Sequence, residues 1–349
     1  MRFYTQQHLF YAGIDLHART LYLCVLDQAG TVVRSVNLKA EPATLLAALA
    51  PYRAGLIVGC ECMFAWYWLA DLCAAEGIPF VLGHALYMKA IHGGKAKNDK
   101  LDAFKIATLL RGGLFPQAYV YPKGMRETRD LLRRRMYLVH QRAQAIAHVQ
   151  NTNSQYNLPV FGKKLVYAGN REELAVAERF CDPSVKRSVE VDLDLIDHLD
   201  ESIATLELYL TRTAKVDDVQ TYHRLKTVPG VGPILALVLL YEIHDIHRFP
   251  TVGDFLSYAR LVRPEKESGG KKLGFGNKKI GNAHLRWALG EAVCLFLRGN
   301  ETAQKWLARK EAKHGKGKAL AILAAKLGRA IYHLWRKQQP FDAARFWSH

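Results

Sequence analysis

Four carboxylates in the first third of the sequence have the residue types and spacing that a metal-dependent reaction on phosphates requires. Asp15 and Glu61 each end a short apolar run, so we expect each at the end of a strand. Asp99 and Asp102 lie three residues apart at the start of a helical pattern, and this spacing puts both carboxylates on one face of a helix. Because like charges at such a distance repel, a bound cation is a common reason to keep them together.

These four acids are therefore predicted to bind divalent metal ions. Two such ions about 3.5–4 Å apart can hold the attacking and leaving oxygens of a phosphoryl transfer. Mg²⁺ prefers carboxylate and water oxygens, and the sequence does not distinguish it from Mn²⁺. A single Asp at a strand end is more often a turn or cap residue, so the prediction depends on the complete set. Lys95 and Lys97 flank the acidic pair, where they either offset its charge or contact a phosphate backbone.

Residues 11–115 have the pattern of an α/β domain, which would position these acids. Turn signals and β-branched runs predict two or three strands within residues 11–38, and later apolar runs predict strands at 55–60 and 79–83. The predicted helices span 43–49, 65–75 and 100–110. This order indicates a mixed sheet with helices on its faces. An RNase H-like (RuvC-like) core has this arrangement, with acids from the first and later strands beside a helical pair.

Two long helices of opposite charge are predicted after this domain. The first, at 124–155, is rich in arginine, and the second, at about 189–212, is acidic with apolar residues on one face. We expect them to pair as an antiparallel hairpin, within one chain or between two, with a less regular link at 157–182. Two interpretations of these arginines are open. They either form a face that is solvated or paired with the acidic helix, or they contact nucleic acid. The candidates for nucleic-acid contact are Arg133 and Arg134.

The sequence has 349 residues and a net charge of +17, and the excess is concentrated at one end. Residues 251–349 contain 20 Lys and Arg against 7 Asp and Glu, so +13 of the net charge lies there. This asymmetry indicates a polyanionic partner bound mainly through the C-terminal region. The alternative is a protein that is basic without such a partner. Half of the residues are apolar, which indicates a globular rather than a disordered chain.

The segment LKTVPGVGPILALVLLYEI, residues 225–243, places a tight glycine-containing turn between two apolar helical runs. It resembles a helix-hairpin-helix, in which free backbone N–H groups at a helix N-terminus bind a phosphate without reading the base sequence. Gly230 and Gly232 are the predicted phosphate contacts. An ordinary turn between two helices is the equally open alternative.

A second segment, residues 263–289, combines a serine with glycines and lysines. Ser268 precedes two glycines, which allow a backbone to approach a phosphate closely. A serine held in this way can attack phosphorus once its hydroxyl is activated. The lysines predicted to neutralise a phosphate backbone are Lys271, Lys272, Lys278 and Lys279. The alternative is a flexible basic loop. Asn282 is a plausible N-cap of the next helix, and His284 is either a base or, more readily, a structural or phosphate-contacting residue.

The cysteines and the lengths of the apolar runs indicate the cellular compartment of the protein. None of the six cysteines forms a CxxC pair or a zinc-like spacing, so they are expected to be buried thiols in a reduced compartment. The longest apolar run, residues 234–241, is far shorter than the ~20 residues that cross a bilayer, and no signal peptide is evident. A cytoplasmic protein without a membrane partner is the expectation. The aromatic group after Glu61, which includes Phe64 and Trp66, has two interpretations, packing or a stacking platform for a nucleotide.

With these residues in hand, the sequence resembles the DEDD-type transposases of bacterial insertion sequences, the one-ten family with its eleven-eleven subgroup. The resemblance covers nearly the whole chain and depends on the order and spacing of five segments. These are GIDLHA, GCE, KNDKLDAFKIATLL, VPGVGPILALVLLYEIHDIHRFP and SGGKK…KKIGNAHLRWAL.

The resemblance implies an organisation and a chemistry for the chain. It implies an RNase H-like catalytic domain at 1–118, a helical linker for oligomerisation at 119–220 and a mainly helical transposase domain at 221–349. On the family pattern Ser268 is the nucleophile and forms a covalent phosphoserine link to DNA. The implied partners are donor and target DNA, a noncoding guide RNA from the same element, and further copies of the chain in a homodimer or homotetramer. The implied place of action is the bacterial nucleoid.

Two other functions use parts of the same residue set. A RuvC-like nuclease would use the four acids and a water molecule, without a serine nucleophile. A nucleic-acid-binding protein on a decayed nuclease fold would need neither the four acids nor the serine. The intact set of acids argues against this possibility. Replacing Ser268 by alanine separates the serine transposase from the nuclease, because it would abolish the activity of the transposase and spare that of the nuclease.

Overall fold

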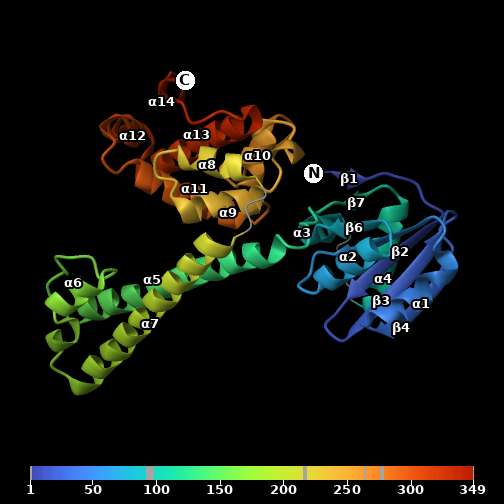
Figure 1. Ribbon diagram of the computed structural model, residues 1–349, viewed down its shortest axis with the longest axis horizontal. Helices are drawn as coiled ribbons and strands as arrows, with labels where there is room; N and C mark the ends of the chain where they lie inside the picture. The colour runs from blue at the N-terminus through green and yellow to red at the C-terminus, as the bar shows by residue number, and fades with distance from the viewer. Residues whose placement is uncertain (1, 92–97, 215–217, 263–264, 276–278, 349) are drawn as a thin grey trace. The chain divides into compact units, whose positions relative to one another are not determined.

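The computed structural model describes residues 2–91, 98–214, 218–262, 265–275 and 279–348. The chain divides into two compact units, Met1–Lys123 and Gly124–His349 (Figure 1). The first unit extends five residues beyond the boundary expected at 118, so residues 119–123 of the expected linker lie in the first unit. The rest of the linker and the expected C-terminal domain lie in the second unit. Three residues predicted to contact nucleic acid lie outside the described ranges. They are Lys95, Lys97 and Lys278.

The first unit contains a mixed five-stranded sheet, as predicted from the order of elements. Its strands are β2 (Phe10–Leu16), β3 (Thr20–Asp27), β4 (Val32–Lys39), β5 (Leu56–Glu61) and β6 (Phe80–Gly83). Their spatial order is β4-β3-β2-β5-β6. The first three strands pair antiparallel, whereas β5 pairs parallel with both β2 and β6. A separate short ribbon joins β1 (Phe3–Tyr4) to β7 (Phe115–Pro116).

Helices cover both faces of this sheet (Figure 1). They are α1 (Pro42–Leu49), the short η1 (Ala50–Tyr52), α2 (Trp66–Ala75), α3 (Ala85–Ile91) and α4 (Asp99–Arg111). Ala12, Ile14 and Leu16 of β2 pack in one hydrophobic cluster with α1 and α2. Tyr11 belongs to a second cluster that contains the buried residues of α4. This alternation follows from the two-residue period of a strand and puts α4 on the opposite face from α1 and α2.

The second unit begins with the two long helices, α5 (Arg126–Gln155) and α7 (Pro183–Thr213). They pack on each other within one chain and are joined by a link that contains α6 (Ala168–Glu173) and η2 (Val176–Arg179). Ion pairs run in opposite directions along the two helices, as an antiparallel pair requires. They are Arg135–Glu207, Arg142–Asp200 and His148–Asp192. The predicted basic–acidic hairpin is therefore present within the chain.

The rest of the second unit is mainly helical. Its elements are α8 (Val219–Lys226), α9 (Pro233–Ile243), η3 (Ile246–Arg248), α10 (Val252–Tyr258), β8 (Glu265–Ser268), β9 (Lys271–Phe275), α11 (Ala283–Phe296), α12 (Glu301–His314), α13 (Lys316–Lys337) and α14 (Ala343–Trp347). Every residue of α9 from Leu235 to Ile243 is buried, so α9 forms the centre of this core. Gly315, at φ 76°, separates α12 from α13, so α13 begins at Lys316.

Several local predictions need correction. The segment expected as a flexible loop contains the antiparallel hairpin of β8 and β9, whose turn is Gly269-Gly270 with φ of +57° and +72°. Two consecutive glycines with positive φ suit the tight primed turns of such hairpins. Of the cysteines expected to be buried, three are exposed, namely Cys62, Cys181 and Cys294. In the aromatic group, Trp66 packs in the core whereas Phe64 is 77% exposed.

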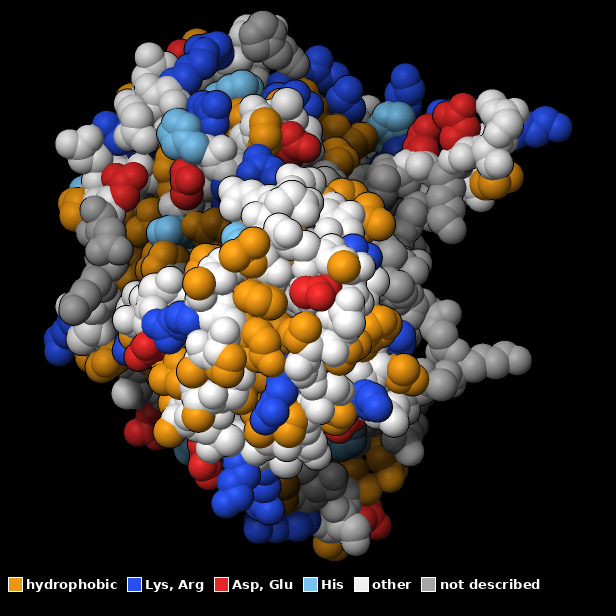
Figure 2. Space-filling view, turned by 90° about the vertical axis from the view of Figure 1, so that its right-hand side faces the viewer, with side chains coloured by type: hydrophobic (Ala, Val, Ile, Leu, Met, Phe, Trp, Pro, Cys, Tyr) orange, Lys and Arg blue, Asp and Glu red, His pale blue; other side chains and the backbone are white. Residues whose placement is uncertain are grey.

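Two surface properties concern possible partners. The centre of the face shown in Figure 2 carries few charged side chains, whereas Lys and Arg gather nearer its upper and lower margins. Within the described residues, no helix combines the length and the apolar character that crossing a membrane would require.

Candidate active site

The carboxyl ends of β2 and β5 carry two of the predicted ligands. In the parallel register Ile14 lies opposite Cys60, so Asp15 and Glu61 follow at matching positions on neighbouring strands. Adjacent strands are about 4.8 Å apart. Because Gly13 and Gly59 face α4 and side chains alternate along a strand, Asp15 and Glu61 also belong to the α4 face of the sheet. Both acids are half-buried, with the Asp15 side chain 15% exposed.

Two glycines allow α4 to lie close to these strands. A Cβ atom on Gly13 would lie 2.2 Å from the carbonyl oxygen of Ala103 and 2.4 Å from the nitrogen of Ala107. A Cβ on Gly59 would lie 2.6 Å from the Leu110 side chain. Any larger residue at Gly13 would therefore push the helix backbone away from the sheet. The glycine in GIDLH is thus a condition for bringing the start of α4 to the acidic strand ends.

The first turn of α4 supplies the other two predicted ligands. The Asn98 side chain caps the helix by accepting a hydrogen bond from the Lys100 nitrogen at 2.9 Å. Asp99 Oδ2 lies 3.5 Å from His17 Nε2, and the same nitrogen lies 3.4 Å from Asp15 Oδ2. Asp102, in contrast, accepts a hydrogen bond from Lys105 Nζ at 3.0 Å.

The geometry therefore brings together Asp15, Asp99 and a histidine. One potential ligand atom from each of Asp15, His17 and Asp99 lies within 4.8 Å of the others. Among the described residues, Glu61 and Asp102 are not part of this group. Two carboxylates and an imidazole are oxygen and nitrogen donors that suit Mn²⁺ and other divalent transition ions, while the carboxylates alone suit Mg²⁺. The donor set accordingly fits a divalent cation, and the four-acid ligand set remains a prediction.

His17 is the site residue that sequence analysis did not identify. Its backbone nitrogen donates to the Thr20 oxygen at 2.9 Å, which closes the tight turn between β2 and β3. The spacing in GIDLH offers a signal, because residues two apart on a strand share a face and His17 stands two after Asp15. Its side chain is 47% exposed, so the imidazole is accessible to solvent as well as to the two acids.

The predicted nucleophile, Ser268, lies in the other unit of the chain. It ends β8, is exposed, and pairs in register with Lys271 across the glycine turn. Among the nearby lysines, Lys272 forms an ion pair of 2.8 Å with Glu265, and Lys279 is exposed. The hydroxyl therefore stands at the tip of a basic hairpin.

The chain that follows this hairpin is fixed to the helical core. Arg260 Nε donates to the backbone oxygens of Ile280 at 3.1 Å and Gly281 at 2.9 Å. Asn282 caps α11 by accepting from the nitrogens of His284 at 2.9 Å and Leu285 at 3.1 Å, as the sequence predicted. The same side chain donates to Glu242 Oε2 at 2.8 Å. The segment between hairpin and helix thus has a defined position relative to α9.

Glu242 is the centre of a buried ionic cluster that sequence analysis missed. Arg133 donates from Nε to Oε1 at 2.6 Å and from Nη2 to Oε2 at 3.0 Å, and Arg129 donates from Nε at 3.0 Å. Burial alone would raise the pKa of Glu242, but the hydrogen bonds and charges of the arginines, with Asn282, lower it to about 2. Arg133 therefore has a structural ion pair, the internal-pairing alternative, while Arg134 lies 5.1 Å from the centre of the Tyr137 ring.

His284 does not have the properties of a general base exposed to substrate. Burial, followed by the charge of Arg133, lowers the pKa of His284 to about 4. Its Nδ1 atom is buried and has no hydrogen-bond partner among the described residues. The imidazole is therefore neutral near pH 7 and sits beside the Glu242 cluster, which favours the structural alternative.

The two glycines of the predicted phosphate-binding turn differ in their surroundings. A Cβ on Gly230, which has φ of +85°, would lie 2.6 Å from both the Ala292 oxygen and the Phe296 nitrogen. Gly232 caps α9, is exposed, and would place a Cβ in open space. Gly230 is therefore explained by close packing on α11, whereas only Gly232 retains access for an anion.

Comparisons with known proteins agree in pointing to one family. Residues 12–157 match the family model for DEDD transposases of the IS110 type, and residues 222–307 match the model described as the transposase IS116/IS110/IS902 family. The chain is 27% identical over 334 residues to the transposase for insertion sequence element IS1111A of Coxiella burnetii, covering 94% of this chain and 90% of that protein. It is 24% identical over 208 residues to the putative transposase y4qE of Sinorhizobium fredii, covering 58% and 49% of the two chains.

Proposed function

The chain belongs to the IS110 family of DNA transposases, and from this premise we propose that it cuts and rejoins DNA through a covalent serine intermediate. The acids Asp15, Glu61, Asp99 and Asp102 are proposed to hold divalent metal ions, with His17 as an additional ligand. The observation that carries this proposal is the convergence of Asp15, near the carboxyl end of β2, with Asp99, in the first turn of α4. The strand order and the position of the acids also support an RNase H-like first domain.

The proposed metal ions fit the chemistry of these donors. A bound divalent ion would supply Lewis-acid stabilisation of the charge on a phosphodiester. The half-buried Asp15 side chain would orient such an ion from the sheet, and Asp99 would approach it from the helix that Gly13 admits. The N-terminus of α4 contributes partial positive charge to the same place, which favours the binding of anionic groups such as phosphate.

In the proposed reaction Ser268 Oγ attacks phosphorus and an Oγ–P bond forms. The P–O3′ bond breaks, and the released 3′ oxygen takes up a proton that balances the one lost by the serine hydroxyl. In the second step a 3′ hydroxyl of another strand attacks the phosphoserine, forms the new phosphodiester and returns the proton to Ser268. Each step exchanges one phosphoester bond for another, so no ATP is required. Exposure of Ser268 at a hairpin tip, next to Lys271, supports this role.

Partners follow from the same proposal. The basic C-terminal region would bind the backbones of donor and target DNA, and an element-encoded noncoding RNA would supply sequence specificity by base pairing. Cutting several strands requires several active sites, so we propose a homodimer or homotetramer. The paired helices α5 and α7 are the proposed contact region between copies.

The test is a denaturing gel of the full chain mixed with Mg²⁺, labelled donor and target DNA, and RNA from the flanks of the element. We expect a labelled band at the mass of protein plus DNA, absent in Ser268→Ala. Ser257→Ala is the matched control, because Ser257 is also exposed and lies on α10 of the same unit. Cut DNA that lacks an adduct and persists in Ser268→Ala would overturn the serine mechanism and favour a nuclease that uses water.

A further inference from the structure

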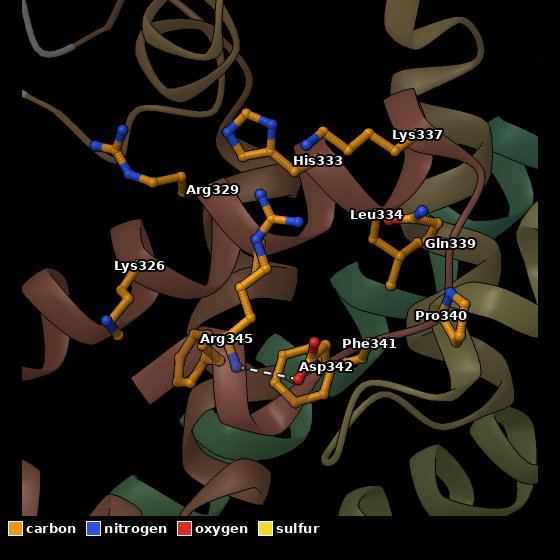
Figure 3. A pocket seen from close by; sticks show the side chains of 12 residues that line it. Lys326, Arg329, His333, Leu334, Lys337, Gln339, Pro340, Phe341, Asp342 and Arg345 are labelled. Atoms are coloured by element: carbon orange, nitrogen blue, oxygen red, sulfur yellow. Dashed lines mark hydrogen bonds between the residues drawn. The ribbon is translucent and has the colours of Figure 1, made fainter. Parts of the chain in front are cut away.

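A basic pocket lies between the second half of α13 and the C-terminal segment of the chain (Figure 3). Its volume is about 150 Å³. Lys326, Arg329, His333 and Lys337 line it from α13, and Arg345 lines it from α14. In Figure 3, the Arg345 side chain extends from α14 toward the row of basic residues on α13. The pocket thus gathers five basic side chains from two helices.

Helical spacing explains why these side chains meet. The four residues on α13 follow one another at intervals of three, four and four, and such intervals keep side chains on one face of a helix. A neighbouring face of α13 is buried, with Leu323, Leu327 and Ile331 in the core. The core therefore fixes the orientation of α13, and the basic row is held toward the pocket.

The positive charge of this pocket is poorly balanced by the protein. The pocket contains one acid, Asp342, and its Oδ1 atom accepts a hydrogen bond from the backbone nitrogen of Arg345 at 3.0 Å as a helix cap. Across the described ranges, Arg329, His333 and Lys337 take part in no ion pair. Four arginines of α5, in contrast, form ion pairs with acids of α7 and α9, namely Arg129, Arg133, Arg135 and Arg142. A row of exposed cations without acids is suited to an anionic ligand.

Burial and, after it, repulsion between the basic groups lower the pKa of two of them. Burial, followed by the charges of Lys337, Arg345 and Arg329, lowers the pKa of His333. Burial, followed by the charges of Arg329 and Lys310, lowers the pKa of Lys326. A phosphate within this group would relieve the repulsion, and its binding would raise the affinity of both side chains for protons.

The floor of the same pocket is apolar and aromatic. Leu334, Phe341 and Phe346 line it beneath the basic groups, and the rings of Phe341 and Phe346 have centroids 5.4 Å apart. Phe346 is 6% exposed, whereas Phe341 is half-buried and so presents part of its ring. An engineered apolar cavity of about this volume, ~150 Å³, admits a benzene ring. The floor can therefore accept a planar ring, and the rim can accept phosphate.

We propose that this pocket binds one unpaired nucleotide of a single-stranded nucleic acid, with its base against Phe341 and its phosphates on Arg329 and Lys337. Stacking on an aromatic side chain needs a base that is free of its partner strand, whereas a paired base in a duplex is not available for it. The proposal depends on the proposed function only in taking nucleic acid as the ligand. It adds a site outside the acid cluster and outside the serine hairpin.

The first test measures binding of the full chain to a labelled ten-nucleotide thymidine strand in EDTA, at several salt concentrations. Matched strands of DNA and RNA, and a duplex containing the DNA strand, are compared. We expect the unpaired strands to bind about tenfold more tightly than the duplex. In Arg329→Gln/Lys337→Gln, affinity for the strand should fall at least about tenfold, and the slope of log K against log salt should decrease by about 1.4.

The matched control is Arg309→Gln/Lys313→Gln, which removes the same charge from exposed positions on α12. It should change affinity by less than about threefold. Equal losses in the two double variants would overturn the pocket in favour of diffuse charge. Equal binding of strand and duplex would overturn the unpaired nucleotide. A difference between the DNA and RNA strands would identify which source of unpaired nucleotide the pocket prefers.

A second variant tests the aromatic floor. Phe341→Leu keeps an apolar side chain but removes the ring, so we expect about five- to tenfold weaker strand binding with an unchanged salt slope. Thermal unfolding checks that the variant is folded. Unchanged binding in a folded Phe341→Leu, or competition by inorganic phosphate as strong as by thymidine monophosphate, would reduce the site to a phosphate site. Because no metal or strand exchange is involved, these outcomes leave the proposed serine reaction untouched.

Discussion

Glu242 and Asp99 are both carboxylates close to basic side chains, yet they differ in burial, in hydrogen bonding and in the charge of their neighbours. The Glu242 side chain is 2% exposed and accepts hydrogen bonds from Arg129, Arg133 and Asn282. The Asp99 side chain is 56% exposed and lies with a second acid, Asp15, on one imidazole. The first carboxylate is satisfied by the protein, so it serves the fold. The second lies close to another carboxylate, and a pair of neighbouring carboxylates is suited to binding a cation.

The difference also lies in what each cluster connects. Glu242 joins α5, α9 and the start of α11, so its bonds stabilise the packing of helices within the second unit. The acid cluster joins the end of β2 and the turn after it to the first turn of α4, where two carboxylates repel each other and share one imidazole. We therefore expect substitutions in the two clusters to have opposite consequences for stability and activity.

The largest expected effect is on activity in the acid cluster. Asp15→Asn should lower adduct formation on the order of 10³-fold or more, because a neutral amide is a poor ligand for a divalent cation. Its melting temperature should stay close to that of the native chain, since the repulsion between Asp15 and Asp99 offsets part of what Asp15 contributes to the fold. Quantification of the adduct band on a gel checks the first expectation, and thermal unfolding checks the second. Asp71→Asn, on α2 of the same unit, is the control and should retain activity.

The reverse pattern is expected for Glu242→Gln. Removing one partner of a buried ion pair costs about 3–5 kcal/mol, because two arginines keep their charge without compensation. Denaturant unfolding should therefore show the second unit destabilised by roughly this amount. At temperatures where the variant remains folded, divalent metal binding should be unchanged. A Glu242→Gln protein as stable as the native chain would contradict the assigned structural role.

The pH dependence of stability offers a further test of the structural role of Glu242. Glu242 has a pKa of about 2 in the folded chain and about 4.5 without these interactions. Below pH 4.5 the unfolded chain takes up this proton first, so its contribution is complete above that pH and is lost as pH falls toward 2. The difference corresponds to about 3 kcal/mol. Denaturant unfolding between pH 6 and 2 should show this loss in the native chain, and Glu242→Gln should lack that component.

A smaller effect is expected from the packing that supports the acid cluster. Gly13→Ala places a methyl group 2.2 Å from the Ala103 oxygen, so α4 must move away from β2. Overpacking of this kind costs about 1–3 kcal/mol. Adduct formation should fall further than the loss of folded protein explains, because Asp99 moves with the helix. Gly77→Ala is the control for a first-unit glycine whose added Cβ meets nothing, although its positive φ also adds some strain.

The parts of the fold and of the candidate site that neighbouring residues determine could be predicted from the sequence. The parts that depend on contacts between residues far apart in the sequence could not. Apolar runs that end in an acid and helical periodicity are local signals, and they predicted the strands that carry Asp15 and Glu61 and, to within one residue, the start of α4. The start of α7 was predicted six residues late, because apolar periodicity begins after the Asp182 cap and Pro183. An Asp–Pro pair is itself a helix-start signal, so this boundary was available in the sequence.

The features that sequence analysis missed depend on contacts between distant residues or on weak patterns. Glu242 stands 109 residues from Arg133 along the chain, and no local pattern relates them. The hairpin of β8 and β9 has few apolar residues to alternate, so only its two glycines indicate a turn. His17 is a single histidine in a turn, and only the tertiary position of Asp99 gives it a chemical role.

The most direct test of the comparison is a calorimetric titration of Mn²⁺ into the full chain, with Asp99→Asn and Glu242→Gln titrated in parallel. We predict saturable binding to the native chain, loss of at least about tenfold in affinity in Asp99→Asn, and native affinity in Glu242→Gln despite its lower melting temperature. Native affinity in a folded Asp99→Asn would contradict the account, because it would show that the cluster of Asp15, His17 and Asp99 does not hold the metal.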